Sequence, residues 1–493
     1  MEATRESQWT AHERRSDRVR AALPALTALA AGLVLRLWLL KKLFEVNGDA
    51  LIYGGVAKNL LLHGRYALNG AGGELYPTLI RLPGYPLFLA LCFRVFGMEN
   101  YAAAAGAQIA LELCGCLLLA GFVRRMAPAE LKAGAAMATL WLAALCPFTA
   151  SYAVVPLAET PTLFAMALAL WALARFRALP GWSSALLFTF AVTWAALLRP
   201  DGALLGVALA PAMFMGLKRG AVARRKLAGM GLVCALMVLL PFGAWAWRNW
   251  QVFHVFEPLA PRLATDPGED THPGWERWVK SWCLDFVSTY DIYWNVPDGP
   301  LDLSKLPGRA FDSPAEYAAT AALAADYNSH GYEITPELDA RFARLADERI
   351  AAHPLRSYVW LPLGRLADMT LRPRVENLPI DLDWWVYAHH RAETRFSWAY
   401  AGLNAVYLLL GLAGVWLCAR CAAPGTWGRT LWAWMVAYMA MRSALLLTVE
   451  APEARYTLEF FPMLFALGGI ALYWLMYSVW LSVLRVKASA GRG

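Results

Sequence analysis

The sequence has few charged residues and lacks the short motifs that mark several common enzyme classes. Only 17% of its 493 residues are Asp, Glu, Lys or Arg, whereas a soluble domain carries about 25%. A phosphate-binding P-loop and a Gly-x-Ser-x-Gly nucleophile elbow are both missing. The eight cysteines are scattered, and they show neither a disulfide framework nor the paired spacings of a structural zinc site. The sequence therefore predicts neither a P-loop nucleotide-binding enzyme nor a domain stabilised by a structural metal ion.

What the sequence has in excess is apolar side chains. Hydrophobic residues make up 59% of the chain, and there are 23 tryptophans, a residue that collects at membrane–water interfaces. The formal net charge is +8, but the basic residues stand in short clusters between apolar runs. That pattern is typical of membrane topology and not of nucleic-acid binding. We therefore expect an all-α polytopic membrane protein with no nucleic-acid partner.

About ten apolar runs approach the roughly 20 residues that a helix needs to cross a membrane. If the N-terminus is cytoplasmic, the basic joints between these runs all fall on the cytoplasmic side, as the positive-inside rule requires. The first run is longer than the core of a cleaved signal peptide, so it is interpreted as a retained signal anchor. The expected spans are 22–44, 101–123, 132–149, 161–176, 183–198, 202–217, 227–247, 396–419, 429–449 and 457–484.

The same alternation divides the chain into five parts. Residues 1–20 and 486–493 are expected as cytoplasmic tails, 21–250 as an N-terminal transmembrane module with a first external loop at 45–100, 251–395 as an extracytoplasmic segment, and 396–485 as C-terminal transmembrane helices.

The first external loop opens with a carboxylate directly before an amphipathic segment. Apolar residues recur near period 3.6 from Ala50 to His63, and Gly64 follows, which predicts a surface helix that ends there. Asp49 is suited to cap the free N–H groups of the first turn. The functional alternative, compatible with capping, is that Asp49 meets the head group of a lipid-borne substrate. The apolar segment 81–97 is expected as a re-entrant or interfacial helix.

Aromatic residues recur at helical spacing in the long external segment: Trp275, Trp278, Trp282 and Phe286. One interpretation is the core face of a small extracytoplasmic domain. The other is a helix that lies in the lipid interface, where tryptophan is favoured.

Several ionisable residues occur inside or at the ends of the apolar runs, where such residues usually face the bundle interior or a wet cavity. Each could merely pair with another charge to hold helices together, but most fall at the same extracytoplasmic level as Asp49. Arginines at that level suit a phosphate, because the guanidinium fork binds two oxygens. The residues are Arg36, Glu112, Glu159, Arg199, Asp201, Arg442, Glu450, Glu453 and Arg455.

Four histidines of the external segment are candidate metal ligands: His254, His272, His389 and His390. They could complete a divalent metal site with Asp49 or Glu159. No two of them have the i, i+4 spacing of a helical zinc site, so the sequence assigns no cofactor with certainty.

Taken in order, these segments resemble the GT-C membrane glycosyltransferases, above all the protein O-mannosyltransferases and the lipid A aminoarabinose transferases. Asp49 with Tyr53, then AKNLLLHGRYAL and YPTLIRLPGYPLFLALCFRVFG, is similar to the first external loop of that family. LAETPTLFAMALALWALARF, LLRPDGALL, WAWRNWQVF and EARYTLEFFPMLFALGGIAL follow in the family's order. The resemblance covers residues 22–250 and 396–484. Many relatives have Glu directly after the loop's Asp, whereas this chain has Ala50.

The resemblance implies a transferase of the cell envelope that takes a sugar from a polyprenyl phosphate and passes it, with inversion, to a lipid, glycan or protein acceptor. It also implies a bacterial-type inner membrane, with the active site on the outer side. It implies that Asp49 is the general base or orients the acceptor, and that Glu159 is a second catalytic acid residue. The arginines expected at the donor phosphate are Arg81, Arg199, Arg248 and Arg455. The acceptor side of the pocket is expected to include Tyr53, Tyr85, Asp201 and Glu453.

Two other functions stay open on the sequence. A multi-span transporter or flippase of a lipid-linked or anionic substrate also fits the spans and the buried charges, although transporters usually bind near mid-membrane and often contain inverted repeats. A catalytically silent scaffold in cell-envelope assembly is the third alternative.

Overall fold

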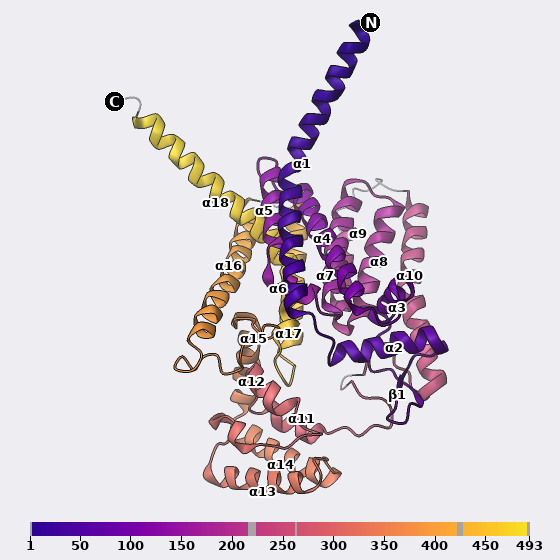
Figure 1. The fold of residues 1–493 in the computed structure, drawn as a ribbon, viewed down its shortest axis with the longest axis vertical. Coiled ribbons are helices and arrows are strands. Elements are labelled where there is room, and N and C mark those ends of the chain that lie inside the picture. Colours follow the sequence, from indigo (N-terminus) through magenta and orange to yellow (C-terminus); the bar gives the residue numbers. More distant parts are fainter. Residues whose placement is uncertain (1, 215–222, 262–263, 422–426, 491–493) are drawn as a thin grey trace. The chain divides into compact units, whose positions relative to one another are not determined.

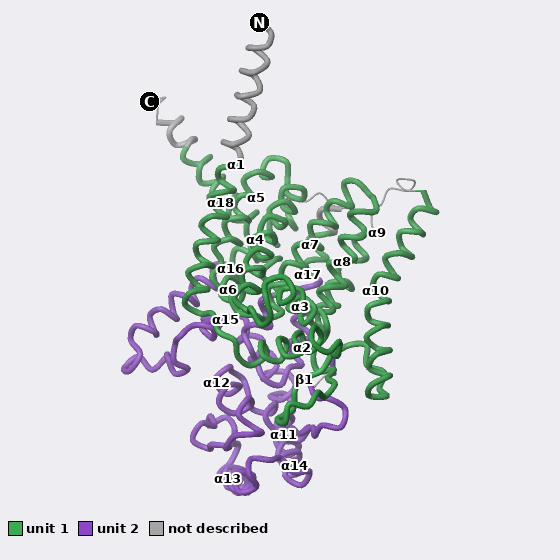
Figure 2. The backbone as a smooth tube through the Cα atoms, turned by 45° about the vertical axis from the view of Figure 1, so that its right-hand side comes forward, with its two compact units in different colours: residues 1–259, 407–436, 459–493 green, residues 260–406, 437–458 purple. Residues whose placement is uncertain are grey.

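The computed structural model describes residues 2–214, 223–261, 264–421 and 427–490. The regular structure of these residues is helical apart from one two-stranded antiparallel sheet, β1 (Ala67–Asn69) paired with β2 (Leu75–Pro77). The chain divides into two compact units, coloured separately in Figure 2: unit 1 comprises residues 1–259, 407–436 and 459–493, and unit 2 comprises residues 260–406 and 437–458. The expected all-α membrane architecture is confirmed.

Unit 1 is a bundle of apolar helices, labelled in Figure 1. Helix α7 is at its centre and packs against α8, α4 and α9, and its side chains are buried nearly all round, as expected of a helix that is apolar on every face. The elements of unit 1 are α1 (Glu2–Leu43), α2 (Asp49–His63), α3 (Gly84–Phe96), α4 (Tyr101–Met126), α5 (Lys132–Ala144), α6 (Pro147–Ala153), α7 (Glu159–Ala178), α8 (Trp182–Leu198), η1 (Pro200–Gly202), α9 (Ala203–Phe214), α10 (Arg224–Phe253) and α18 (Phe461–Ala490).

Several of the expected spans are present as long apolar helices. Among the described residues, five helices are long and apolar enough to cross a membrane: Ala22–Leu43, Tyr101–Met126, Arg224–Phe253, Arg391–Arg420 and Ala454–Val483. A sixth crossing results if α5 and α6, which are bent by 53° at their junction, form one span. Other expected spans correspond to shorter apolar helices, such as Trp182–Leu198 and Leu431–Leu446. The expected span 202–217 extends beyond the described residues. The chain is a multi-pass membrane protein.

The surface helix predicted after Asp49 is present in the segment 45–100. Helix α2 ends at Gly64, whose φ of 65° is the left-handed conformation that glycine adopts without strain. One face of α2 packs on α3 and β1, while Leu51 and Leu62 on the other side are each 55% exposed. A Cβ at Gly84 would lie 2.6 Å from the carbonyl oxygen of Leu197. Glycine at this position therefore lets α3 approach the end of α8 closely.

The buried charges of the first two spans pair with each other. Arg36 Nε lies 2.6 Å from the Glu112 carboxylate, and Arg36 Nη1 donates to the carbonyl oxygens of Gly32 and Ala144. The Arg36 side chain is fully buried and that of Glu112 is 6% exposed. For these two residues the structural interpretation, a pair that joins α1, α4 and α5, is confirmed.

Unit 2 is built around tryptophan. Trp275, Trp278 and Trp282 are each at most 2% exposed, and the first two pack against Phe342 of α14. Their rings belong to one buried apolar cluster, so the core interpretation is confirmed and the interfacial-helix interpretation of this segment is wrong. The elements of unit 2 are α11 (Pro273–Lys280), α12 (Phe286–Ser288), η2 (Thr289–Tyr293), η3 (Leu303–Lys305), η4 (Gly308–Ala310), α13 (Pro314–Ser329), α14 (Pro336–Ala352), η5 (Arg356–Trp360) and α15 (Leu361–Leu371). The boundary between the units passes through α16 (Arg391–Cys421), α17 (Trp427–Leu446) and η6 (Ala454–Phe460).

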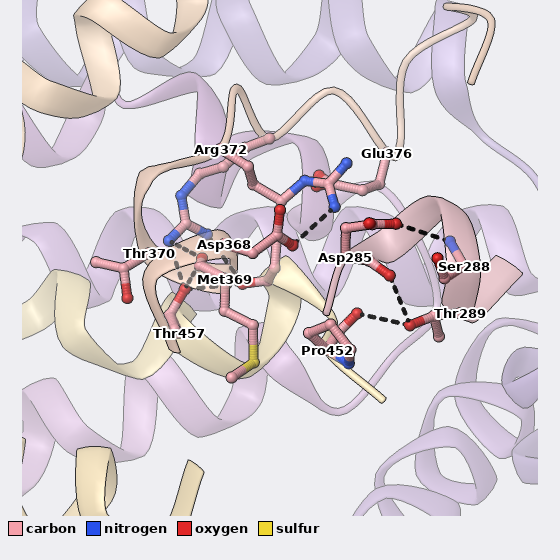
Figure 3. Close-up of polar contacts among 12 residues, drawn as sticks. Asp285, Ser288, Thr289, Asp368, Met369, Thr370, Arg372, Glu376, Pro452 and Thr457 are labelled. Atoms are coloured by element: carbon pink, nitrogen blue, oxygen red, sulfur yellow. Dashed lines mark hydrogen bonds and ion pairs between the residues drawn. The ribbon is translucent and has the colours of Figure 1, made fainter. Parts of the chain in front are cut away.

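A carboxylate with a raised pKa lies on α15 in unit 2. Asp368 is 22% exposed and lies 3.3 Å from Arg372 Nη1, while Arg372 Nε contacts Glu376 at 2.5 Å (Figure 3). Burial raises the pKa of Asp368 from 3.8 to about 6; Arg372 opposes this increase, and the carboxylates of Asp285 and Glu376 add to it.

Asp368→Asn is expected to stabilise the protein relative to wild type near pH 8 but not near pH 4. The pKa is higher in the folded chain, so the stabilising contribution of Asp368 is complete below its unfolded pKa of 3.8 and is lost as the pH rises through about 6. The difference between the folded and unfolded pKa of Asp368 corresponds to a change in the free energy of unfolding of roughly 3 kcal/mol at most. Melting midpoints of both proteins from pH 4 to 8 test this. Asp347→Asn, at a side chain that is 54% exposed, is the control, and a constant difference across pH would contradict the prediction.

Candidate active site

Asp49 forms an ion pair with Arg81 within the first external loop. Arg81 Nη2 donates to Asp49 Oδ1 at 2.6 Å, and the two side chains are 21% and 23% exposed. Gly48 occupies the N-cap position, and Asp49 is the first residue of α2. The expected N-cap role is therefore wrong by one residue. Asp49 stands in the first turn, where the helix dipole favours a negative charge, and its carboxylate faces Arg81.

Tyr53 lies one turn further along α2. The guanidinium carbon of Arg81 is 5.9 Å from the centre of the Tyr53 ring. Tyr85 of α3 packs edge-on against Tyr53, with ring centres 4.8 Å apart. The Tyr85 hydroxyl donates in turn to Gln108 of α4 at 2.6 Å. Burial raises the pKa of Tyr53 to about 12. Its hydroxyl therefore keeps its proton at neutral pH and can both donate and accept a hydrogen bond.

Arg199 is the centre of a second charged group, which gathers three carboxylates. Arg199 Nη1 donates to Glu159 at 3.0 Å, and Arg199 Nε lies 3.3 Å from Asp201 and 3.2 Å from Glu459. Glu159 and Glu459 are each 5% exposed, and the other two side chains are 17% exposed. Glu159 is the first residue of α7, where the helix dipole again favours an acid.

The turn that carries Arg199 is determined by local sequence. Arg199 has extended backbone angles, φ −146° and ψ 135°, as expected for a residue before proline, and Pro200 opens η1. A Cβ at Gly202 would lie 2.2 Å from the carbonyl oxygen of Ala195, so glycine allows the turn to fold back onto α8. This return holds Arg199 and Asp201 against the end of α8.

The two charged groups lie around one point of unit 1. Tyr53 and Tyr85 share a buried apolar cluster with Ala158 and Leu198, the residues directly before Glu159 and Arg199. The charges of both groups also act on the Tyr53 hydroxyl. Together the groups contain four carboxylates and two guanidinium groups, a formal charge of −2. The site can therefore orient hydroxyl or amino groups of a substrate, and its positive charge comes from Arg81 and Arg199.

The carboxylates of this site are oxygen donors of the type that Mg²⁺ and Mn²⁺ prefer. Within the described ranges, however, no three of them bring ligand atoms close enough to share an ion, and no described histidine joins Asp49 or Glu159 in such a group. The Arg199 guanidinium contacts all three of its neighbouring carboxylates. The arrangement does not fit a divalent ion held by side chains alone, and Arg199 provides positive charge among them.

Arg248 fastens the first external loop to α10. Its Nη1 and Nη2 donate to the carbonyl oxygens of Thr78 and Tyr66 at 2.8 and 2.7 Å. The guanidinium carbon also lies 5.3 to 5.4 Å from the ring centres of Tyr66, Trp245 and Phe253. The role of Arg248 at a donor phosphate stays a prediction.

Two further predicted residues belong to unit 2. Arg455 Nε contacts Glu453 Oε2 at 2.5 Å, and the Tyr456 hydroxyl donates to Glu453 Oε1 at 2.6 Å. They pair with each other, and their roles toward donor and acceptor stay predictions.

Glu459 is a member of the site that the sequence did not single out. It lies in the segment EARYTLEFFPMLF, from which the sequence predicts Glu453 and Arg455 as site residues. Its position directly before the long apolar helix α18 was the available signal, because a carboxylate at the end of a span is costly without a partner.

Comparison with known proteins finds similarity in structure. No protein-family model matches the sequence, and no curated protein matches it significantly. The archaeal oligosaccharyltransferase AglB from Archaeoglobus fulgidus, in complex with an inhibitory peptide and a dolichol-phosphate, superposes with a TM-score of 0.50 at 12% identity over 96% of this chain and 52% of that chain. The Archaeoglobus fulgidus enzyme tethered to an acceptor peptide gives 0.50 at 13% identity over 94% and 50%. ArnT from Cupriavidus metallidurans bound to undecaprenyl phosphate gives 0.38 at 15% identity over 91% and 76%.

At these identities the similarity concerns the fold. The chain spans about half the length of the archaeal oligosaccharyltransferase, and it is nearly covered by that match. The fold of membrane helices, expected from the ordered sequence segments, is thus shared with an oligosaccharyltransferase.

Proposed function

We propose that this chain, which has the fold of the GT-C membrane glycosyltransferases, is an inverting glycosyltransferase that moves a sugar from a polyprenyl-phosphate donor to an acceptor. Its place would be a bacterial-type inner membrane, with the N-terminus in the cytoplasm and the active site on the outer face. The acceptor is a lipid, glycan or protein of the cell envelope.

The observation that carries this proposal is the pairing of acids with arginines around Tyr53. Asp49 is on α2 and Glu159 on α7, their partners Arg81 and Arg199 lie in turns of the same unit, and the charges of both pairs influence the pKa of Tyr53. A transfer from a lipid phosphate needs an acid residue near the nucleophile and positive charge near the leaving group. Residues that the family resemblance indicates supply both kinds of group, which supports the proposal.

In the proposed reaction Asp49 accepts the proton of the acceptor hydroxyl or amine. The acceptor atom forms a bond to the anomeric carbon while the bond from that carbon to the phosphate oxygen breaks. The polyprenyl phosphate leaves with the electron pair of the broken bond. Attack opposite the leaving group inverts the anomeric centre. Arg81 fixes the orientation of the Asp49 carboxylate through their 2.6 Å contact.

The proposal assigns the donor phosphate to Arg199. Its fork is held by carboxylates on several sides, so its orientation is set before a substrate binds, which is what electrostatic stabilisation of a leaving group requires. Oligosaccharyltransferase of the same fold has been observed with dolichol-phosphate, which supports a lipid phosphate as the leaving group here. Tyr53 and Asp201 are then left to contact the acceptor or the sugar.

The test is a transfer assay with purified protein in liposomes. The donors are polyprenyl phosphates that carry different labelled sugars, and a lipid and protein extract of bacterial envelopes is the acceptor. We expect label to leave the donor and to appear in the extract together with an equal amount of free polyprenyl phosphate. Label that crosses the bilayer while it stays on the donor lipid would instead establish the flippase alternative.

A further inference from the structure

One helix of unit 2 exposes a continuous row of apolar side chains, outside the candidate active site. The backbone is helical from residue 354 to residue 371, through η5 and α15. Residues four apart share one face of a helix, and here every exposed residue of that stretch is uncharged. The row, called the apolar row below, consists of Leu355, Val359, Leu363, Ala367 and Leu371, with Tyr358 and Trp360 beside it.

The other side of this helix packs into unit 2. Leu361, Arg365 and Met369 are buried. Arg365 Nη1 donates to the carbonyl oxygens of Lys280 and Cys283, both at 2.9 Å, and so joins the helix to the end of α11. The inner side therefore fixes the direction in which the apolar row points.

The charged groups of the helix lie away from the apolar row. Arg356 donates to both oxygens of Asp312 at 2.5 and 2.6 Å, and Asp368 pairs with Arg372. The preceding helix of the same unit, α14, differs, because charged side chains are prominent on its exposed face, as is usual toward water. Those side chains are Glu337, Arg344, Asp347 and Glu348. The two helices thus expose surfaces suited to different surroundings.

The apolar row ends beside a membrane span. Asn404 Nδ2 donates to the carbonyl oxygens of Thr370 at 2.8 Å and Arg372 at 3.3 Å, and Leu371, between these two acceptors, is exposed. Asn404 belongs to α16, which is long and apolar enough to cross a membrane. Trp398 of the same helix is 67% exposed, as expected of a tryptophan that meets lipid at the end of a span. The apolar row therefore adjoins a surface that already faces lipid.

We propose that the apolar row is a membrane-contacting surface and that helix 354–371 lies in the lipid interface. Such helices bury their apolar face about 5–10 Å into the boundary between head groups and acyl chains. Tyr358 and Trp360 suit this level, because each has an apolar ring with one polar group that can reach water. The partner is bilayer lipid irrespective of head-group charge, since the row has no basic side chain. The contact holds unit 2 at the bilayer and is independent of sugar transfer.

Two tyrosines of unit 2 form a matched pair for the test. Tyr358 is 69% exposed and Tyr317 of α13 is 48% exposed, so Tyr358 should be oxidised at least as fast if both face water. Full-length protein in phosphatidylcholine vesicles is exposed to hydroxyl radicals formed in the water, and oxidation of each tyrosine is followed by mass spectrometry. We expect oxidation of Tyr358 to be slower by about tenfold, because lipid covers it.

A reagent in the lipid phase identifies what covers the apolar row. A photoactivatable diazirine carried on an acyl chain is expected to label Leu363 and to leave the charged exposed face of α14 unlabelled. The same labelling is expected when anionic lipid is added to the vesicles. Equal oxidation of Tyr358 and Tyr317 would show that the row faces water and would overturn the proposal. If neither reagent modifies the row, another protein surface covers it, and the lipid contact is refuted.

Discussion

Asp49→Asn is expected to lower sugar transfer by at least about 100-fold, because a positioned general base contributes about 10²- to 10⁴-fold to the rate. Asparagine keeps the size of the side chain and can still accept the hydrogen bond that Arg81 donates to Asp49. The geometry of the loop is therefore preserved while the proton acceptor is lost. The measurement is the initial rate of label transfer by purified protein, with the melting midpoint as a check of folding.

Glu99→Gln is the matched control for this variant. Glu99 also pairs with a basic residue of the first external loop, Lys58, at 2.8 Å, but its side chain is 45% exposed and it is not part of the candidate site. Near-normal transfer by Glu99→Gln beside a loss in Asp49→Asn would assign the effect to chemistry. Transfer by Asp49→Asn at about a tenth of the wild-type rate or more would remove Asp49 from the role of base.

Local features of the fold were predictable because they depend on neighbours in sequence. The period of apolar residues and Gly64 predicted α2, which ends where expected. The predicted N-cap was wrong by one residue at the start of the same helix, where Gly48 and not Asp49 holds the N-cap position. A cap and a first-turn acid have almost the same sequence signature, so the contact with Arg81 decides between them, and that contact is tertiary.

The candidate site shows the same division. The turn around Arg199 follows from Pro200 and Gly202, which are adjacent in sequence. The third carboxylate at Arg199 comes from Glu459, far along the chain. Spacing and periodicity contain no information on which distant acid contacts a given arginine. The sequence therefore predicted that acids would accompany Arg199, but it did not identify each of them.

The tryptophans of unit 2 illustrate why one pattern supported two interpretations. A helix with aromatic residues on one face has the same sequence whether that face meets lipid or protein. Asp339 of α14 decides the matter, since its carboxylate accepts the backbone N–H groups of Gly274 and Trp275. It thereby fixes α11 against α14 and turns the tryptophan face into the core. This partner lies outside the aromatic pattern.

The second large effect is expected from Arg199→Met. Methionine fills a similar volume but leaves Glu159 and Glu459, each 5% exposed, without their common cation. Removal of one partner from a buried ion pair destabilises a protein by about 3–5 kcal/mol, so the melting midpoint should fall clearly and sugar transfer should be lost. Both are measured on protein purified in the same detergent.

The double variant Arg199→Met with Glu459→Gln separates charge burial from loss of packing. Glu459→Gln alone is expected to cost little, because Arg199 keeps Glu159 and Asp201 as partners. In the double variant, Glu459→Gln removes the negative charge of one of the two carboxylates that have lost Arg199 as their common cation. It should therefore recover part of the stability that Arg199→Met loses. Transfer should stay absent, since the guanidinium at the leaving group is missing in both. If the two substitutions simply add in stability, the proposed role of Arg199 as the common counter-ion of these carboxylates fails. Sugar transfer by Arg199→Met at a near-normal rate would contradict its role at the donor phosphate.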